Sequence, residues 1–298
     1  MTFIVLVIIF LILLAFYRYG KRDFSCDIIT REKQIEKGKN FFKNKKVAIC
    51  SLIRDGEDRL GDIIPKVNRL GKLFKDYKVF VVENDSKDNT RKILLDWADT
   101  NKNVFVLGCD GVNLPECKLN MKPTIDHDVS EYRINKMATL RNVYLEEVKK
   151  HKDIDLVIVW DFDIVGKLDM NGLFLSGYRL YQDENINAIC ANGIRKEGPF
   201  YVYYDTYAYR EFGDGDGFKT YYDLKYSGLN GCGNNIPLKY VRSCFGGFTI
   251  YRKEALSSLS YGTYKNKRNY NICEHEYLNE NIDGVYHSNE LLYLINKS

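Results

Sequence analysis

From residue 46 onward, short apolar runs of strand length alternate with stretches whose apolar residues recur at helical spacing. Four apolar runs predict buried strands, at residues 47–53, 79–83, 104–107 and 156–160. Helices are expected at residues 62–74, 91–100 and 130–150. This alternation is typical of a mostly parallel sheet that is covered by helices on both faces. The sequence therefore predicts an α/β fold.

Polar side chains follow three of the four predicted strands. Arg54 and Asp55 come after the first strand, the segment ENDSKDNT at residues 83–90 ends the second, and the triplet DFD at residues 161–163 follows the fourth. In open α/β sheets, ligands bind beyond the carboxyl ends of the strands. We therefore expect these three clusters to converge on one binding site.

The DFD triplet places Asp161 and Asp163 at the tip of a buried strand. Two carboxylates in this position can present hard oxygen ligands to Mg²⁺ or Mn²⁺, which can in turn neutralise a diphosphate leaving group. So short a string also fits two solvated acids at a strand end. Glu83 and Asp85 strengthen the first reading, because a ribose and a base edge could be hydrogen-bonded at the end of the neighbouring strand. One of the later polar residues of that segment also fits a helix cap.

The first residues of the chain predict a membrane anchor. Residues 2–17 carry no charge and would span about 24 Å as a helix, slightly less than the apolar core of a bilayer. Arg18, Lys21 and Arg22 follow and could reach the interface. A cleaved signal peptide is less consistent, because a basic n-region and a small-residue cleavage site are missing. We predict a transmembrane helix at 2–19, a polar stem at 20–45 and a folded domain at 46–298.

Charge and cysteine usage exclude some functions. The 44 basic and 40 acidic residues give a net charge of +4, which is too balanced to indicate a nucleic-acid-binding protein. The eight cysteines include no CxxC pair, so we expect no structural zinc site. Cys109 and Cys117 are the first candidates for a disulfide, and buried free thiols are an equally good interpretation.

Two further motifs complete an ordered set. They are SCFGG at residues 243–247 and Cys273-Glu274-His275 near the C-terminus. With ENDSKDNT, the helix that carries Arg133 and Arg141, and VIVWDFD, they resemble the GT-A glycosyltransferases. More closely, the set resembles the fungal capsule-associated mannosyltransferases and related viral enzymes. The resemblance covers residue 47 to the C-terminus and implies a GT-A, Rossmann-like catalytic domain.

The resemblance implies a nucleotide-sugar donor, either a UDP- or a GDP-sugar, a carbohydrate-bearing acceptor on a glycan, protein or lipid, and Mn²⁺ or Mg²⁺. The residues expected to contact the donor are Arg54, Glu83, Asp85, Arg133, Arg141, Asp161, Gly246 and Gly247. The expected metal ligands are Asp161, Asp163, His275 and His287. Glu274 is the expected general base of an inverting transfer. Surface charge for the two arginines, a plain turn for the glycines and a half-buried strand position for His287 are the structural alternatives.

The resemblance and the charge pattern disagree on which side of the membrane the domain lies. Basic residues after the anchor favour the cytosol, whereas most anchored transferases of the secretory pathway face the lumen. A single-pass protein of a Golgi, endoplasmic reticulum, viral or host membrane is therefore expected, with either facing. Tyrosines crowd residues 200–222 and fit cross-strand packing or contact with the acceptor. The DGDG string that begins at Asp214 fits a flexible loop, because Lys225 stands where a calcium loop needs glutamate.

Two other functions fit parts of the sequence. VIVWDFDIV resembles the nucleophile motif of haloacid-dehalogenase-like phosphatases, with Asp161 as the nucleophile. That motif normally opens its domain, whereas about half of this chain precedes it, and the other motifs would have no explanation. The second alternative is a catalytically inactive sugar-binding or scaffold protein. The presence of Asp161, Asp163 and Glu274 together argues against it.

Overall fold

The computed structural model describes residues 31–108, 130–197, 200–214 and 237–296, together with Val5, Val7, Ile9 and Phe10. Most of the predicted membrane anchor lies outside the described residues, as do the predicted pair Cys109 and Cys117 and the loop after Asp214. Among the helices that are described, none is both long enough and apolar enough to cross a membrane.

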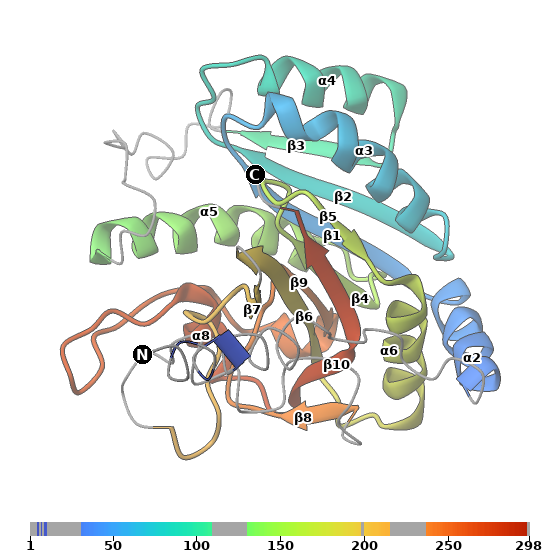
Figure 1. Ribbon diagram of the computed structural model, residues 1–298. Helices are drawn as coiled ribbons and strands as arrows, with labels where there is room; N and C mark the ends of the chain where they lie inside the picture. The colour runs from blue at the N-terminus through green and yellow to red at the C-terminus, as the bar shows by residue number, and fades with distance from the viewer. Residues whose placement is uncertain are drawn as a thin grey trace.

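A 10-stranded sheet with helices packed against it forms the body of the protein (Figure 1). The strands are β1 (Lys46–Ile53), β2 (Asp76–Glu83), β3 (Val104–Gly108), β4 (Leu156–Trp160), β5 (Gly166–Leu168), β6 (Ala188–Glu197), β7 (Phe200–Tyr203), β8 (Leu238–Tyr240), β9 (Phe248–Arg252) and β10 (Val285–Ile295). The helices are α2 (Glu32–Lys43), α3 (Glu57–Gly71), α4 (Thr90–Thr100), α5 (Glu131–Lys150), α6 (Met170–Gln182), α8 (Glu274–Asn279) and the 3₁₀ helix η3 (Lys253–Leu256).

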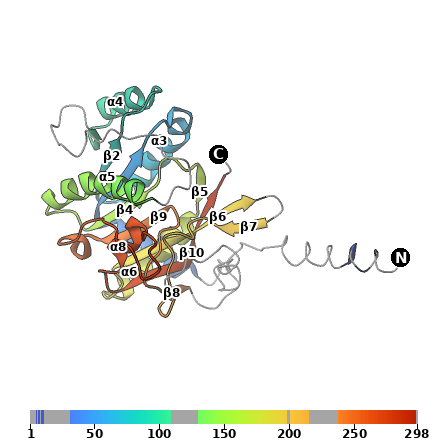
Figure 2. The same ribbon diagram turned by 90° about the vertical axis from the view of Figure 1, so that its left-hand side faces the viewer.

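The sheet is mixed, with strand order β3-β2-β1-β4-β9-β6-β10-β5. The predicted strands and helices of residues 47–160 are confirmed, with small shifts at their ends. The expectation of a mostly parallel sheet is wrong beyond β4, because β9 is antiparallel to both β4 and β6. An apolar run carries no information on strand direction, so this reversal could not be predicted. β7 and the end of β6 project from the body as a two-stranded ribbon (Figure 2).

Alternate residues of each central strand face two separate apolar layers. In β1, Val47 and Ile49 face the layer that α2, α3, α4 and α6 complete. Ala48 and Cys50 face the opposite layer, which contains residues of α5 and α8. Successive side chains of a strand point to opposite faces, so a strand that is covered on both sides must be apolar throughout. This double covering explains the continuous apolar run that predicted β1.

The second half of the predicted stem is a helix, α2, that packs against α6. Ile35 and Phe42 are 7% and 0% exposed, and both belong to the same apolar layer as α3. Arg31, just before α2, pairs with the buried Glu290 of β10. Residues 31–43 are therefore part of the folded body. The domain boundary at residue 46 stays a prediction.

Candidate active site

The carboxyl ends of β1 and β2 lie side by side, with Ile53 paired to Glu83. The loops that follow these strands are joined by several hydrogen bonds. The Asp55 N–H donates to Ser86 Oγ (3.0 Å), the Lys87 N–H donates to Asp55 Oδ1 (2.7 Å), and the Gly56 N–H donates to Thr90 Oγ1 (2.8 Å). Asp55 and Asp85 adopt φ angles of 48° and 53°, which are strained for residues other than glycine. The hydrogen bonds between the loops hold these two positions in place. The predicted convergence of these two loops is confirmed.

The DFD turn is held from three sides. The Asp161 N–H donates to the Gly247 carbonyl (3.1 Å) and the Phe162 N–H donates to Ser51 Oγ of β1 (3.1 Å). The Tyr293 hydroxyl donates to the Ile164 carbonyl (2.7 Å). Phe162 is buried between the two acids, whereas Asp163 is exposed. The turn therefore presents Asp163 outward from a rigid base.

Arg141 of α5 joins the DFD turn to the start of α8. Its Nη2 donates to Asp161 Oδ1 (3.3 Å) and its Nε donates to Glu274 Oε1 (3.0 Å). The guanidinium is buried and lies over the rings of Phe245 (5.5 Å) and Tyr261 (5.9 Å). Arg141 is therefore not a surface charge. It orients one predicted metal ligand and the predicted general base at the same time.

The two acids of the DFD turn resist carrying negative charge together. Burial raises the pKa of Asp161 to about 8, with Arg141 opposing and the charges of Asp163 and Asp205 adding to the rise. Burial by the surrounding walls also raises the pKa of Asp163, although its carboxylate reaches solvent. A divalent cation would relieve this repulsion, and carboxylate oxygens suit Mg²⁺ or Mn²⁺. The described residues contain no group of three or more His, Cys, Asp or Glu side chains that could hold a metal ion.

Asp205 is an acid of the site that the sequence did not reveal. It follows β7, and its Oδ1 accepts the Ala208 N–H (3.2 Å), while the Gly246 N–H also bonds to the carboxylate. Burial raises the pKa of Asp205 to about 6, and the charge of Glu274 adds to the rise. It belongs to no recognised motif, and only its place within the tyrosine-rich segment could have drawn attention to it.

A cavity of about 430 Å³ opens beside the DFD turn, between α5 and the ends of β1 and β2. Arg54, Arg133 and Asp163, which were predicted to bind the donor or metal, line it together with the unpredicted Lys136. A larger cleft of about 610 Å³ lies beside α4 and contains Asp85. Three aspartates and two cations, Arg91 and Lys92, line this second cleft, so its small negative charge suits a diphosphate less well than the basic cavity does. Asp85 and Arg54 therefore face different hollows.

Glu83 is not positioned to touch a ligand directly. Its side chain is fully buried. One carboxylate oxygen accepts the Ser86 N–H (2.7 Å), and the other pairs with Arg91. Both oxygens thus support the β2–α4 loop from within. A fully buried side chain does not fit the direct contact with the nucleoside that was expected of Glu83. Asp85 is the exposed acid of the pair.

The two predicted histidine ligands do not join the DFD acids in a cluster. His275 is buried, stacks on Phe245 with ring centroids 3.8 Å apart, and has a pKa well below its usual value because of burial and the Arg141 charge. His287 is buried on β10, where it packs against Tyr203 and Tyr209. Since β10 lies three strands from β4, His287 is roughly 14 Å from the DFD strand. These positions place His287 among core aromatics.

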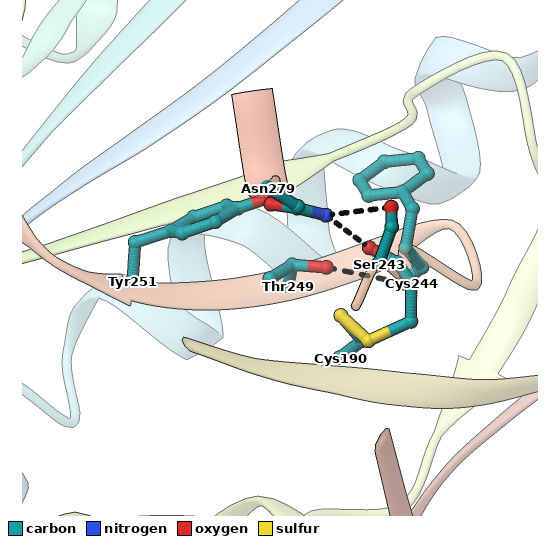
Figure 3. The surroundings of a disulfide bond; sticks show 7 residues. Cys190, Ser243, Cys244, Thr249, Tyr251 and Asn279 are labelled. Carbon is teal, nitrogen blue, oxygen red and sulfur yellow. Dashed lines mark hydrogen bonds between the residues drawn. A yellow bond between two sulfur atoms is a disulfide. The ribbon is translucent and has the colours of Figure 1, made fainter. Parts of the chain in front are cut away.

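The SCFGG segment is tied to β6 and α8. Cys244 forms a disulfide with Cys190 of β6, and the Asn279 amide donates to Ser243 Oγ (3.2 Å) and to the Cys244 carbonyl (2.8 Å) (Figure 3). Tyr251 in turn donates to Asn279 Oδ1 (3.1 Å). The same short helix that begins with Glu274 therefore ends by holding the SCFGG segment in place.

Residues 46–280 match the model of a protein family described as Cryptococcal mannosyltransferase 1. This range contains every predicted site residue except His287. The chain belongs to this family. None of the curated proteins matches its sequence.

Several solved structures are similar at low identity. TarS 1–349 of S. aureus is 15% identical with a TM-score of 0.45, and the match covers 85% of this chain and 60% of that one. Mannosyltransferase PcManGT of Pyrobaculum calidifontis, in complex with GDP-Man and Mn²⁺, is 12% identical with a TM-score of 0.43, over 96% and 64% of the two chains. A mycobacterial protein is 13% identical with a TM-score of 0.48, over 89% and 72%. The chain thus spans about 60% of the TarS structure, and the family assignment rests on the family match.

For this member of the Cryptococcal mannosyltransferase 1 family, the glycine pair has a structural explanation. A Cβ atom on Gly246 would lie 2.1 Å from the Ala191 carbonyl oxygen of β6, and its φ angle is +67°. The Gly247 carbonyl receives the Asp161 N–H. The glycines therefore let the SCFGG segment approach β6 and support the DFD turn. Their expected contact with the donor stays a prediction.

Gly246→Ala is expected to destabilise the protein by about 3 kcal/mol or more, because the positive φ angle and the contact with a backbone oxygen each cost about 1–3 kcal/mol. Urea unfolding measures the change. Gly61→Ala is the matched control, since a Cβ atom there meets nothing within 4 Å, and helix propensity should make it neutral or slightly stabilising. Equal stabilities for the two variants would contradict the packing argument.

Proposed function

We propose that this protein is a metal-dependent glycosyltransferase that moves a sugar from a nucleoside diphosphate donor to a carbohydrate-bearing acceptor. The observation that carries the proposal is the position of Asp161 and Asp163 beside a basic cavity, with Glu274 fixed nearby through Arg141. The family description supports mannose as the transferred sugar. Mannosyl donors are therefore the first to test.

In this proposal the DFD turn holds the metal ion and the basic cavity holds the donor diphosphate. Asp161 and Asp163 supply hard oxygen ligands from a turn that three hydrogen bonds make rigid. When bound, a divalent ion would neutralise charge on the leaving diphosphate. Arg133 of α5 and Arg54 after β1 line the cavity, where they can orient the phosphates by charge-assisted hydrogen bonds.

Glu274 remains the proposed proton acceptor for an inverting transfer. It is 6% exposed, and Arg141 binds only one of its oxygens. The other oxygen lies 3.5 Å from the Cys273 thiol. Asp205 is a second carboxylate close enough to interact electrostatically with Glu274, and a base with a pKa near the working pH is favoured in proton transfer. Glu274→Gln and Asp205→Asn, compared by their pH–rate profiles, would identify which carboxylate accepts the proton.

The proposal is tested with the full chain in detergent, Mn²⁺, and a panel of GDP- and UDP-sugars with GDP-mannose first. Release of nucleoside diphosphate, dependent on an added glycan acceptor, is expected with one donor and should stop when EDTA removes the metal. Steady release of inorganic phosphate from phosphate monoesters would instead favour the phosphatase alternative. No turnover and no nucleotide binding would leave only a scaffold function.

The raised pKa of Asp161 predicts a pH dependence of metal binding. The ion binds the carboxylate form, so protons compete with it below a pH of about 8. Mn²⁺ affinity should therefore rise by about tenfold per pH unit up to that point and then level off, because one proton is displaced for each ion bound. Titration followed by the electron paramagnetic resonance signal of free Mn²⁺ measures this. An affinity independent of pH between 6 and about 8 would contradict the assignment of Asp161 as a ligand.

A further inference from the structure

Lys136 is a mostly buried lysine whose ammonium group has no partner among the residues that the structure describes. It lies on α5 about one turn after Arg133, is 7% exposed, and lines the basic cavity. No hydrogen bond or ion-pair contact joins it to any residue in the described parts of the chain. Burial lowers the pKa of Lys136, Arg54 and Arg133 add repulsion, and Asp85 opposes them. A buried cation without a partner is costly, so such a group indicates an anionic ligand.

Two other cations of the cavity also have unused donors. The Nε atoms of Arg54 and Arg59 are buried and have no hydrogen-bond partner among the described residues. The Arg54 Nε atom lies 3.4 Å from Asp55 Oδ2, and the Arg59 Nε atom lies 3.7 Å from Oδ1 of Asp58, whose side chain is 75% exposed. Contacts with exposed carboxylates compensate little of the charge. The cavity wall therefore presents several donors that an anion could satisfy.

The charge of the cavity fits the leaving group better than the intact donor. Its lining contains five basic side chains, Arg54, Arg59, Lys87, Arg133 and Lys136, and two acidic ones, Asp55 and Asp163, an excess of three positive charges. A sugar nucleotide carries about two negative charges, whereas a free nucleoside diphosphate carries about three near neutral pH. The excess thus matches the charge that develops as the sugar departs, and groups placed to bind that charge favour the transition state.

We propose, on the basis of the function proposed above, that this cavity binds the nucleoside diphosphate through its own cations, without a metal ion, and that Lys136 contributes at least a factor of ten to the affinity. The metal ion at Asp161 and Asp163 is then required for sugar transfer but not for nucleotide binding. Because the cavity is complementary to the leaving group, free nucleoside diphosphate binds more tightly than the corresponding sugar nucleotide.

Calorimetric titration of the full chain with GDP and with UDP, in EDTA and at low salt, tests the proposal. We expect one of the two nucleotides to bind without metal, and Lys136→Met to weaken that binding by at least tenfold. Lys136→Arg keeps the charge and should lose less. Lys150→Met is the matched control, since Lys150 lies exposed at the end of the same helix and pairs with Glu147. It should bind like the wild-type protein.

Three results would overturn the inference. Nucleotide binding that requires Mn²⁺ would show that the cations are insufficient, while acceptor-dependent turnover would leave the proposed function intact. Wild-type affinity in a folded Lys136→Met variant would remove the role of Lys136. If that variant does not fold, the salt dependence of the wild-type dissociation constant is measured instead. Binding through several cations must weaken steeply with added salt. An affinity that is insensitive to salt would exclude this mode of binding. Absence of both binding and turnover would instead refute the proposed function.

Discussion

Replacing Arg141 by methionine is expected to lower the free energy of unfolding by about 3–5 kcal/mol, since its removal leaves the buried Glu274 carboxylate uncompensated. Arg141 is 3% exposed and bonds to both Asp161 and Glu274. For a chain of this size, the melting temperature should fall by about 5–8 °C. Transferase activity should fall below detection, because neither acid is then oriented.

Arg133→Met provides the matched control for Arg141→Met. Arg133 lies on the same helix and lines the cavity, but it is only half-buried. Its replacement should change the free energy of unfolding by no more than about 1 kcal/mol, as is usual for cations that are not buried in an ion pair. Urea unfolding of both variants provides the comparison. Similar losses of unfolding free energy for the two variants would show that the ion pairs of Arg141 do not stabilise the site.

Asp163→Asn is expected to reduce kcat by about a hundredfold to a thousandfold, because the loss of a group that stabilises transition-state charge typically has effects of this size. Asparagine keeps the size of the side chain but removes the charge that a divalent ion requires. Stability should be almost unchanged, since Asp163 is exposed. Asp161→Asn should reduce kcat by a similar factor. Its free energy of unfolding should not fall much, because burial already disfavours the charged form of Asp161.

Asp58→Asn controls for the asparagine substitutions. Asp58 lies at the start of α3, near the same edge of the sheet, and is exposed. Its kcat should stay within about twofold of wild type, as is usual for surface substitutions remote from the chemistry. Initial rates at saturating donor and Mn²⁺ give the comparison. A kcat for Asp163→Asn that resembles the Asp58→Asn value would exclude Asp163 from the metal site.

Local sequence pattern was sufficient to predict the first half of the fold. The apolar runs that became β1, β2 and β4 are buried on both faces, so burial alone determines their composition. The polar residues at their carboxyl ends meet because parallel strands end on one edge. Asp161 and Asp163 were found for the same reason.

Features that depend on contacts between distant segments could not be predicted. The Cys190–Cys244 disulfide joins residues separated by 54 positions, and the eight cysteines allow many pairings. Asp205 and Lys136 belong to no motif and gain their environment only when β7, α5 and the DFD turn meet. Glu83 was expected to contact the donor because its motif is polar, but both of its carboxylate oxygens bond to other residues of the loop and of α4. A polar motif does not distinguish groups that bind a ligand from groups that support them.

A crystal structure of the protein with GDP and Mn²⁺ tests the central claim most directly. The account predicts anomalous density for manganese at the carboxylates of Asp161 or Asp163, with the diphosphate in the cavity beside Arg133 and Lys136. A nucleotide bound in the acidic cleft beside α4, or manganese located away from the DFD turn, would contradict it.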